Sequence, residues 1–333
     1  MERRSFLNTL FIASAGLGLS QNASAEIFNK SKQPPFRRCD FSVDDNRISY
    51  FPEGLTTPLK IIQISDTHLW MDDMRGEQFI QYSKRMSKAY NVTKHFRTGE
   101  PLNPVKAFEE VLDMAVKRKA DLIAMTGDIF SFPSEAAIEW VYEKLKNTGI
   151  PCLYISGNHD WHYEGMEGSS QSLREIWTKK RLNILYQGND PMMASYKLNG
   201  ITVLAIDNST YEILPGQLEF LRKHVREGAP FILMMHIPMF APGRSYGCGD
   251  PSWGAKTDTS FGLERRERWP ENGPSQVTLD FHREVFSAPS LLGIFAGHIH
   301  RQTIDMVSGI PQFTADANAT GAYLEIDFRT AKD

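Results

Sequence analysis

The sequence predicts an α/β fold in which a second β-sheet packs on the first. Three observations support this: short apolar runs that each end at a polar cluster, helical patterns between several of them, and shorter strand-like segments toward the C-terminus. The composition is that of a folded chain, because 41% of the 333 residues are hydrophobic and 23% are charged. With 37 basic and 40 acidic residues, no overall basic field points to nucleic acid or anionic lipid.

The N-terminal residues 1–25 are expected to be a signal peptide of the twin-arginine type, outside the fold. Arg3-Arg4-Ser5-Phe6-Leu7 resembles the twin-arginine motif, and Ala23-Ser24-Ala25 forms an A-x-A cleavage site. The mildly apolar run Leu7–Leu19 between them is too short to cross a bilayer as a helix. We therefore expect a periplasmic or secreted protein that uses the export machinery.

Two departures from the twin-arginine pattern leave the type of export route undecided. Glu2 stands where Ser or Thr is usual, and Asn8 stands where Lys is usual. A general secretory signal or a short uncleaved anchor is the alternative. Residues 26–57 are interpreted as an N-terminal extension, and the main domain is expected over residues 58–330.

Five apolar runs are predicted to be strands buried on both faces, because they are short and rich in β-branched and aliphatic residues. Each run stops at residues with oxygen or imidazole side chains. In order, the runs and the residues that follow them are 59–65 before Asp66-Thr67-His68, 122–126 before Gly127-Asp128, 152–156 before Gly157-Asn158-His159-Asp160, 231–235 before His236, and 291–296 before Gly297-His298-Ile299-His300.

Helical patterns separate several of these strands, as is typical of an α/β fold. Apolar residues recur at helical spacing over residues 105–116, 138–145, 218–225 and 277–285. Pro104 suits the first turn of one helix, and Ser134 suits the N-cap of the next.

Shorter strands are predicted in the C-terminal half, and they are the reason for expecting a second sheet. They cover Met192–Leu198, Ile201–Asp207, Gln302–Val307, Pro311–Ala315 and Tyr323–Phe328. Asn199-Gly200 and Ser308-Gly309 are typical of the two-residue turns that join hairpin strands.

The polar clusters are expected to meet at one rim, because α/β sheets bind ligands beyond the carboxyl ends of their strands. Glycines before Asp128, Asn158 and His298 are expected to permit sharp departures from the strands. The candidate ligands are Asp66, His68, Asp128, Asn158, His236, His298 and His300. Carboxylate, imidazole and amide donors suit Mn, Fe, Zn or Co, and seven donors are enough for two divalent ions. Such a pair is the usual device for displacement at phosphorus.

In order and spacing, these clusters resemble the calcineurin-like metallophosphoesterase superfamily, whose pattern is D-x-H, G-D, G-N-H-D/E, a lone His and G-H-x-H. The resemblance spans about residues 58–328. It implies a four-layer αββα sandwich of two mixed sheets flanked by helices, with a dinuclear metal site at the carboxyl ends of the strands. It also implies that metal-bound hydroxide attacks a phosphomonoester or phosphodiester of small-molecule size.

The resemblance further implies a role for each site residue. The ligands would be Asp66, His68 and His300 for the first metal, Asn158, His236 and His298 for the second, and Asp128 as the bridge between them. His159 would protonate the leaving oxygen, and Asp160 would orient His159.

Two other functions stay open at this point: a non-catalytic metal-binding module on the same scaffold, and a nuclease that acts on single strands. Ser131 stands where the purple acid phosphatase branch has a ferric-binding Tyr, and Ile129–Pro133 lacks the D-R-G extension of protein Ser/Thr phosphatases. We expect a small-molecule phosphoester substrate and no stable nucleic-acid or membrane partner.

Three insertions near the rim, at 70–103, 161–170 and 241–274, are long for loops in a compact domain. Their arginines, among them Arg75, Arg85, Arg97, Arg244, Arg265, Arg266 and Arg268, either hold a non-reacting phosphate or carboxylate or form a solvated surface. A disulfide between Cys39 and Cys248 is left open, and Cys152 is interpreted as a buried thiol.

Overall fold

The structure is a computed structural model that describes residues 39–88, 92–244, 247–253 and 273–330. The signal peptide expected over 1–25 lies outside the described residues, so export and location stay predictions. Arg265, Arg266 and Arg268 of the third insertion also lie outside them. Across the described segments, no helix is both long enough and apolar enough to span a membrane.

The first sheet is mixed and contains three of the predicted buried strands. Its order is β1 (Asp40–Asp44), β2 (Arg47–Phe51), β14 (Leu324–Phe328), β3 (Leu59–Ile64), β6 (Leu122–Thr126) and β7 (Cys152–Ile155). Strands β3, β6 and β7 run parallel, whereas β14 is antiparallel to β3 and parallel to β2. The three parallel strands therefore end at the same edge, as predicted.

The second sheet is also mixed and contains the other two buried strands. Its order is β12 (Thr303–Val307), β13 (Ile310–Thr314), β11 (Leu291–Ala296), β10 (Phe231–Met234), β9 (Ile201–Ile206) and β8 (Met193–Leu198). The four inner strands are parallel to one another, and β12 and β8, each antiparallel to its inner neighbour, form the edges. Both predicted hairpins are confirmed: Asn199 and Gly200, and Ser308 and Gly309, have the positive φ values that such turns require.

Strands β1 and β2 lie before residue 58, where no strand was predicted. They form a hairpin, and β2 pairs with β14, so that Arg47 faces Glu325 across the sheet. The first sheet therefore begins at Asp40, inside the segment interpreted from sequence as an extension.

The four predicted helices are present. They are α2 (Pro104–Lys117), α3 (Glu135–Thr148), α6 (Pro215–Glu227) and α8 (Gln276–Val285). Pro104 occupies the first turn of α2, and the Ser134 side chain accepts a hydrogen bond from the Ala137 N–H at the start of α3. Both positions match the sequence prediction.

Further short elements that were not predicted lie in the first insertion and over residues 170–186. They are the 3-10 helix η1 (Met74–Phe79), α1 (Ile80–Met86), the strand pair β4 (Thr93–Lys94) and β5 (Pro101–Leu102), α4 (Ser170–Trp177), the π-helix η2 (Thr178–Leu182) and α5 (Asn183–Tyr186). A 3-10 turn, η3 (Asn318–Thr320), follows β13. The described parts of the first insertion, residues 70–88 and 92–103, therefore contain helices and strands.

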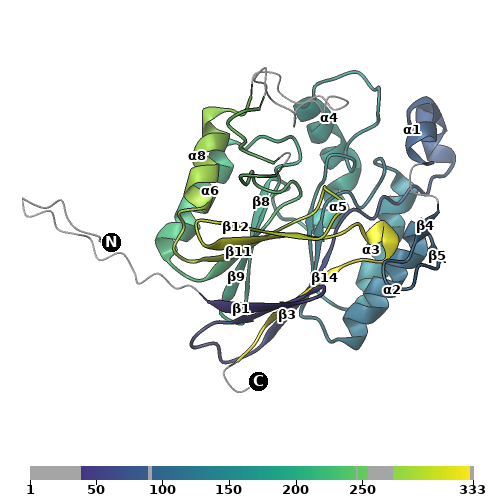
Figure 1. Ribbon diagram of the computed structural model, residues 1–333. Coiled ribbons are helices and arrows are strands. Elements are labelled where there is room, and N and C mark those ends of the chain that lie inside the picture. Colours follow the sequence, from purple (N-terminus) through teal and green to yellow (C-terminus); the bar gives the residue numbers. More distant parts are fainter. Residues whose placement is uncertain (1–38, 89–91, 245–246, 254–272, 331–333) are drawn as a thin grey trace, which may run out of the picture. The chain divides into compact units, whose positions relative to one another are not determined.

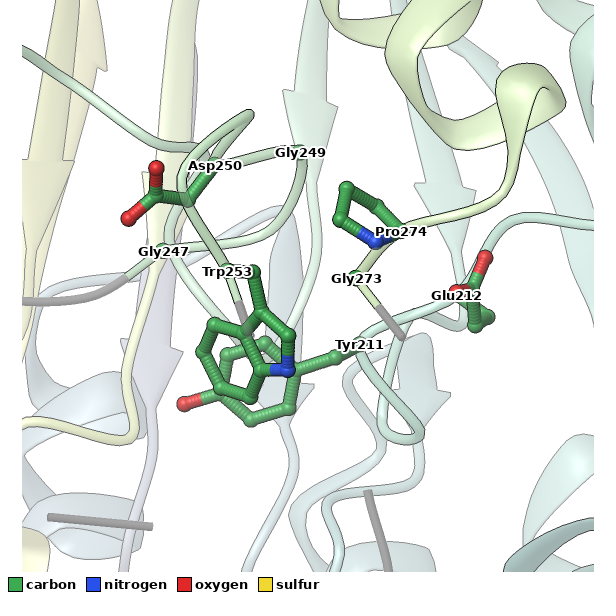
Figure 2. A pocket seen from close by; sticks show the side chains of 8 residues that line it. All are labelled: Tyr211, Glu212, Gly247, Gly249, Asp250, Trp253, Gly273 and Pro274. Carbon is green, nitrogen blue, oxygen red and sulfur yellow. The ribbon is translucent and has the colours of Figure 1, made fainter. Parts of the chain in front are cut away.

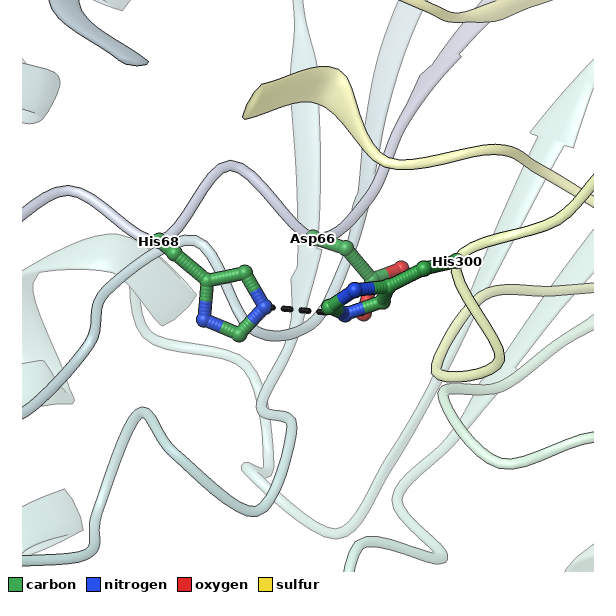
Figure 3. A group of neighbouring side chains, drawn as sticks. All are labelled: Asp66, His68 and His300. Carbon is green, nitrogen blue, oxygen red and sulfur yellow. Dashed lines mark hydrogen bonds and ion pairs between the residues drawn. The ribbon is translucent and has the colours of Figure 1, made fainter. Parts of the chain in front are cut away.

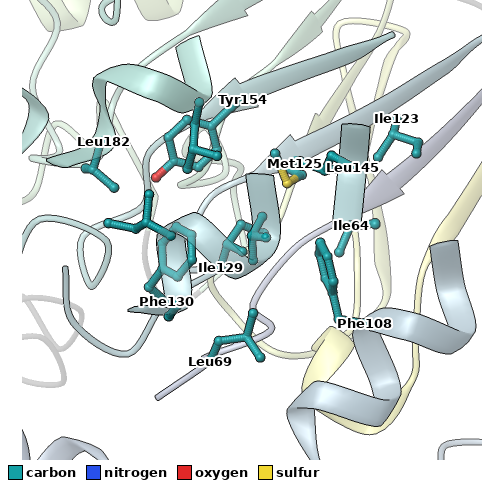
Figure 4. Packing of buried hydrophobic residues seen from close by; sticks show 14 of the residues in the cluster. Ile64, Leu69, Phe108, Ile123, Met125, Ile129, Phe130, Leu145, Tyr154 and Leu182 are labelled. Carbon is teal, nitrogen blue, oxygen red and sulfur yellow. The ribbon is translucent and has the colours of Figure 1, made fainter. Parts of the chain in front are cut away.

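Three apolar clusters separate four layers, which confirms the αββα sandwich. Between the sheets, Ile61 and Leu122 of the first sheet pack with residues of the second, including Ile232 and Phe295. On the other face of the first sheet, α2 and α3 cover Ile64, Ile123 and Met125 with Phe108, Leu145 and their neighbours (Figure 4). On the other face of the second sheet, α6 and α8 cover β9, β10 and β11, and Figure 1 shows these helix pairs on opposite sides of the strands.

The cysteines are free thiols, so the possible Cys39–Cys248 disulfide is not present. Cys248 is buried, whereas Cys39 and Cys152 are half-buried. The interpretation of Cys152 as a plain thiol holds, although its side chain is less buried than expected.

A cluster of charges on β14 links three neighbouring strands, β2, β14 and β3. Lys60 Nζ lies 2.5 Å from Glu325 Oε1 and also contacts Asp327, and Arg47 lies 3.4 Å from Glu325. The Glu325 side chain is only 3% exposed. Burial raises the pKa of Glu325, but Lys60 outweighs this effect and keeps the pKa below its usual value. The buried Glu325 carboxylate therefore needs the positive charge of Lys60 to stay ionised.

Replacing Lys60→Met should lower the free energy of unfolding at pH 7 by about 1–3 kcal/mol, because it leaves a buried carboxylate with fewer partners. A carboxyl with a lowered folded-state pKa stabilises the fold above its unfolded pKa, and this contribution is lost as the pH falls through the folded value. The difference between the variant and wild type should therefore shrink below about pH 4. Urea unfolding at both pH values measures it.

Lys146→Met is the matched control, because the Lys146–Glu143 pair is 65% and 60% exposed and should contribute less than about 1 kcal/mol. An equal loss in both variants, or a Lys60→Met effect that does not change with pH, contradicts the interpretation.

Candidate metal centre

The predicted site residues lie in loops just beyond the carboxyl ends of five strands, and the structure brings them together. By strand they are Asp66 and His68 after β3, Asp128 after β6, Asn158, His159 and Asp160 after β7, His236 after β10, and His298 and His300 after β11. Strands β3, β6 and β7 belong to one sheet, and β10 and β11 belong to the other. The centre therefore lies where the two sheets meet.

The loops after β3 and β6 stay paired beyond the sheet. The Asp66 N–H donates to the Gly127 carbonyl at 3.0 Å, and the His68 N–H donates to the Asp128 carbonyl at 3.0 Å. The Ser131 hydroxyl, at the position where a ferric ligand was considered, donates to the His68 carbonyl at 2.9 Å. The Ser131 side chain thus helps to position the loop after β3 by bonding to the backbone of that loop.

Five of the candidate ligands have a left-handed backbone. Their φ values are 58° for Asp66, 55° for His68, 51° for Asp128, 71° for His298 and 49° for His300. This conformation costs a residue with a Cβ roughly 1–2 kcal/mol. It persists where the surrounding structure holds it, and it gathers at functional sites. The loops are therefore shaped by their bonds to neighbouring segments and not by local preference.

The three glycines of the motifs serve two different purposes. Gly127 has a φ of 90°, as expected for a sharp departure from a strand. Gly157 and Gly297 do not have positive φ, so the expectation of a special backbone is wrong for them. They are needed for close packing, because a Cβ on Gly157 would collide with Asp128, and a Cβ on Gly297 would collide with Ser65 and Asp66.

The first group of candidate ligands is Asp66, His68 and His300. Their ligand atoms lie within 4.8 Å of one another. His68 Nε2 is 3.0 Å from His300 Nε2, and His300 Nε2 is 3.3 Å from Asp66 Oδ1. Figure 3 shows the two rings facing each other, with the carboxylate beside His300. Asp66 and His68 are buried, whereas the His300 side chain is 30% exposed.

The second group is Asp128, His236 and His298, again with ligand atoms within 4.8 Å of one another. His236 Nε2 is 3.3 Å from Asp128 Oδ2 and 3.2 Å from Asn158 Oδ1, so Asn158 lies beside this group. His236 Nδ1 is 2.9 Å from the Thr126 carbonyl and donates to it, which leaves Nε2 as the ligand atom.

Tyr211 is a residue of this centre that sequence reasoning missed. Its hydroxyl is 2.8 Å from His298 Nε2, so His298 keeps Nδ1 for a ligand role. The Tyr211 ring packs against Trp253 with centroids 4.6 Å apart. Both rings line a small cavity of about 10 Å³ with Asp250 and Gly273 (Figure 2). Tyr211 belongs to no strand-end motif, so the sequence carried no signal that singled it out.

His159 is next to both groups and belongs to neither. Its backbone N–H donates to Asp128 Oδ1 at 2.8 Å, and its half-buried ring lies 5.2 Å from the His68 ring. Burial lowers the pKa of His159 below its usual value. The His159 ring thus lies beside the candidate ligands, and its nitrogens belong to neither ligand group.

The sequence predicted that Asp160 orients His159, and this role stays a prediction. The Asp160 carboxylate accepts the Phe130 N–H and the Gly157 N–H, both at 2.8 Å, and it is fully buried. It therefore ties the loop after β6 to the loop after β7. Burial raises the pKa of Asp160 to about 8, and the nearby Asp128 charge adds to this.

The carboxylates of the two groups stay charged despite burial. Burial raises the pKa of Asp66, but its hydrogen bond to His300 and the charges of His300 and His236 together lower the pKa to about 2. The pKa of Asp128 lies well below its usual value, because His236 and neighbouring rings overcome the effect of burial. In return, Asp128 raises the pKa of His236 to about 10 against the effect of burial. The centre therefore favours positive charge.

The donor types and their spacing fit two cations. Two donors bound to one ion at about 2.1 Å and at right angles lie about 3.0 Å apart. The measured separations, 3.0 and 3.3 Å in the first group and 3.2 and 3.3 Å in the second, agree with this. Imidazole, carboxylate and amide oxygen donors suit Mn, Fe, Zn or Co, as expected from the sequence.

Four rim arginines are already paired, which weakens the expectation that they hold a substrate anion. The partners are Glu139 for Arg75 at 2.7 Å, Glu164 for Arg85 at 2.8 Å, Asp45 for Arg97 at 2.6 Å, and Asp305 for Arg244. The guanidinium groups of Arg75, Arg85 and Arg97 are exposed and charge-balanced, whereas the Arg244 side chain is nearly buried against Asp305.

Several known proteins are similar in sequence to this chain. The family profile described as calcineurin-like phosphoesterase matches residues 59–302. A probable cyclic nucleotide phosphodiesterase of Psychrobacter sp. (strain PRwf-1) is 21% identical over 287 residues, which cover 77% of this chain and 74% of that protein. The DNA double-strand break repair protein Mre11 of Sulfurisphaera tokodaii is 27% identical over 261 residues, which cover 75% of this chain and 51% of that protein.

The chain thus spans about half the length of the Mre11 relative. Among solved structures, a dimetal phosphatase from Danio rerio aligns with a TM-score of 0.49 at 11% identity. That alignment covers 80% of this chain and 91% of the other.

Gly297→Ala should destabilise the protein by about 1–3 kcal/mol, because the new methyl group collides with Ser65 and Asp66 and must push the loops of the two sheets apart. Thermal unfolding measures the loss. Gly216→Ala is the control, since its nearest neighbour would be Met193 Cε at 3.8 Å, an ordinary contact. Equal unfolding temperatures for both variants would show that the close packing at Gly297 is unimportant.

Proposed function

The chain belongs to the calcineurin-like phosphoesterase family, and from this premise we propose that it hydrolyses small phosphodiesters with two divalent cations as cofactors. The observation that carries the proposal is the pair of ligand groups, one with Asp66 and one with Asp128, beside a histidine that belongs to neither. In this proposal Asp66, His68 and His300 bind one cation, and Asn158, His236 and His298 bind the other. Asp128 bridges them.

When bound, the two cations would supply a water of lowered pKa and offset the charge that builds up on phosphate oxygens. The chain holds the ligands in place before binding, because the backbone and side-chain bonds of Asp66, Asp128 and His236 already fix these groups.

His159 would donate a proton or a hydrogen bond to the leaving oxygen. A buried imidazole with a lowered pKa is mostly neutral at pH 7 and still has one ring N–H. An anionic phosphoester close to the ring opposes the effect of burial, because negative charge favours the protonated form. Asp160 supports this role indirectly by holding the Gly157 and Phe130 backbone.

A small diester is favoured over a nucleic acid for two reasons. The Psychrobacter relative is named as a probable cyclic nucleotide phosphodiesterase. Arg75, Arg85, Arg97 and Arg244 are each paired with a carboxylate, so these four rim side chains offer a polyanionic strand little free positive charge. The Mre11 relative supports the second candidate, a nuclease, and binding of oligonucleotides with steep salt dependence would favour it.

Asp128→Asn should lower metal affinity by about 10–100-fold or more, since it removes the charge that both cations share. Metal analysis should find fewer than two ions per chain, and hydrolysis of bis(p-nitrophenyl) phosphate should fall with it. The exposed Asp113→Asn is the control for loss of a carboxylate. Unchanged metal content and activity in Asp128→Asn would refute the proposal.

His159→Ala should reduce kcat by about 10²–10⁴-fold, the usual contribution of a general acid, with metal content unchanged. His159→Gln keeps an N–H donor but cannot be protonated near neutral pH, so partial activity would indicate hydrogen bonding as the main role. Loss of bound metal in both variants would instead make His159 a ligand.

A further inference from the structure

We propose that two buried asparagines, Asn318 and Asn208, are positioning residues that each hold one of the two cation positions. This inference rests on the proposed function, because it assigns the residues to the two ligand groups. Both side chains are 0% exposed, and neither belongs to a family motif or to the ligand groups. Each one bonds to the loop that carries ligands of one group.

Asn318 holds the loop that carries Asp66 and His68. Its backbone N–H donates to the Ser65 carbonyl at 2.8 Å, and the next N–H, of Ala319, donates to the Asp66 carbonyl at 3.1 Å. Its side-chain Oδ1 accepts the hydroxyl of Thr67, which lies between the two ligands, at 2.9 Å.

Asn318 is itself firmly placed. Its Nδ2 donates to the Ala322 carbonyl at 3.0 Å, which closes the turn η3. Thr93 Oγ1 donates to the Ala319 carbonyl at 2.6 Å, and the Phe96 N–H donates to the Thr320 carbonyl at 2.9 Å. The first insertion, through β4 and the residues after it, therefore supports the turn that holds the ligand loop.

The left-handed conformations of Asp66 and His68 explain why this support matters. Together they cost roughly 2–4 kcal/mol, so the loop needs bonds that compensate. Gly127 and Asp128 supply bonds on one side of the loop, and Asn318 with Ala319 supplies them on the other. Without the Asn318 side chain, the buried Thr67 hydroxyl loses its partner and the loop can relax away from the ligand geometry.

Asn208 holds the loop that carries His236. It follows β9, and its side chain bonds twice to Ile237: Nδ2 donates to the Ile237 carbonyl at 2.6 Å, and Oδ1 accepts the Ile237 N–H at 3.0 Å. Beyond the end of β10, the Asn208 side-chain amide thus pairs with the Ile237 backbone as a neighbouring strand would. On the other side, the Gly297 N–H donates to the His236 carbonyl at 2.9 Å.

The two asparagines contact different loops, and each loop carries ligands of one group only. Asn318 bonds to residues 65–67, next to Asp66 and His68 of the first group. Asn208 bonds to Ile237, next to His236 of the second group. Removing one side chain should therefore weaken one cation position more than the other.

The test is the binding of Mn²⁺ alone to the full chain after chelation. Titration calorimetry gives the affinities, and anomalous diffraction from crystals at limiting Mn²⁺ identifies which position is occupied. Asn318→Ala should lower affinity at the Asp66 group by about 10–100-fold and change the Asp128 group by less than about threefold. Asn208→Ala should give the reverse pattern.

Thr67 supplies a gentler pair of variants, in case the alanine variants fold poorly. Thr67→Val removes the hydroxyl that bonds to Asn318 at nearly constant volume, and Thr67→Ser retains it. Thr67→Val should weaken the same position as Asn318→Ala, whereas Thr67→Ser should bind Mn²⁺ nearly as wild type does. Circular dichroism and thermal unfolding verify the fold of every variant.

The outcomes separate this inference from the proposed function. Wild-type chain that binds two Mn²⁺ ions, with variants that weaken both positions equally or neither, contradicts the inference alone. If the wild-type chain fails to bind two ions per chain with Mn²⁺ and also with Zn²⁺, the proposed function and the inference are both contradicted. Selective loss at opposite positions in the two asparagine variants supports both.

Discussion

Two buried negative charges set the main constraint on this structure. Asp66 and Asp128 are 0% and 1% exposed, and among the described residues no lysine or arginine pairs with either carboxylate. Buried carboxylates need opposite charge and hydrogen bonds, since isolated charges in a protein interior are very unfavourable. Histidine rings and backbone N–H groups supply both here, and the same donors suit cations. The chemistry of the centre follows from this balance.

Each ligand group takes residues from both sheets. Asp66 and His68 come from the first sheet and His300 from the second, and the other group is divided in the same way. The apolar layer between the sheets therefore fixes the distance between ligands as well as the fold. A substitution in that layer can alter the centre without touching it.

Much of this arrangement could be predicted from sequence, for local reasons. The buried strands, helices and hairpins have their own periodicity, caps or turn residues, as Ser134 and Asn199-Gly200 illustrate. The motifs also placed every candidate ligand at a strand end. Strand β1 has only a weak signal, because it is short and mostly exposed, and its two apolar residues, Phe41 and Val43, lie among polar ones. Strand β2 is placed by its pairing with β14, more than two hundred residues away. Single polar residues such as Asn208 and Asn318 resemble ordinary turn residues in sequence, and only their distant bonds reveal their importance.

The position of β14 has a consequence for how the chain reaches its final form. This strand lies between β2 and β3, although it follows every other strand in the sequence. The ribosome therefore delivers it last, and until then the β1–β2 hairpin has no neighbour to join it to the rest of its sheet. Completion of the sheet, and of the centre it supports, must wait until β14 has been synthesised, so the growing chain exposes this unfilled gap to chaperones or to other chains.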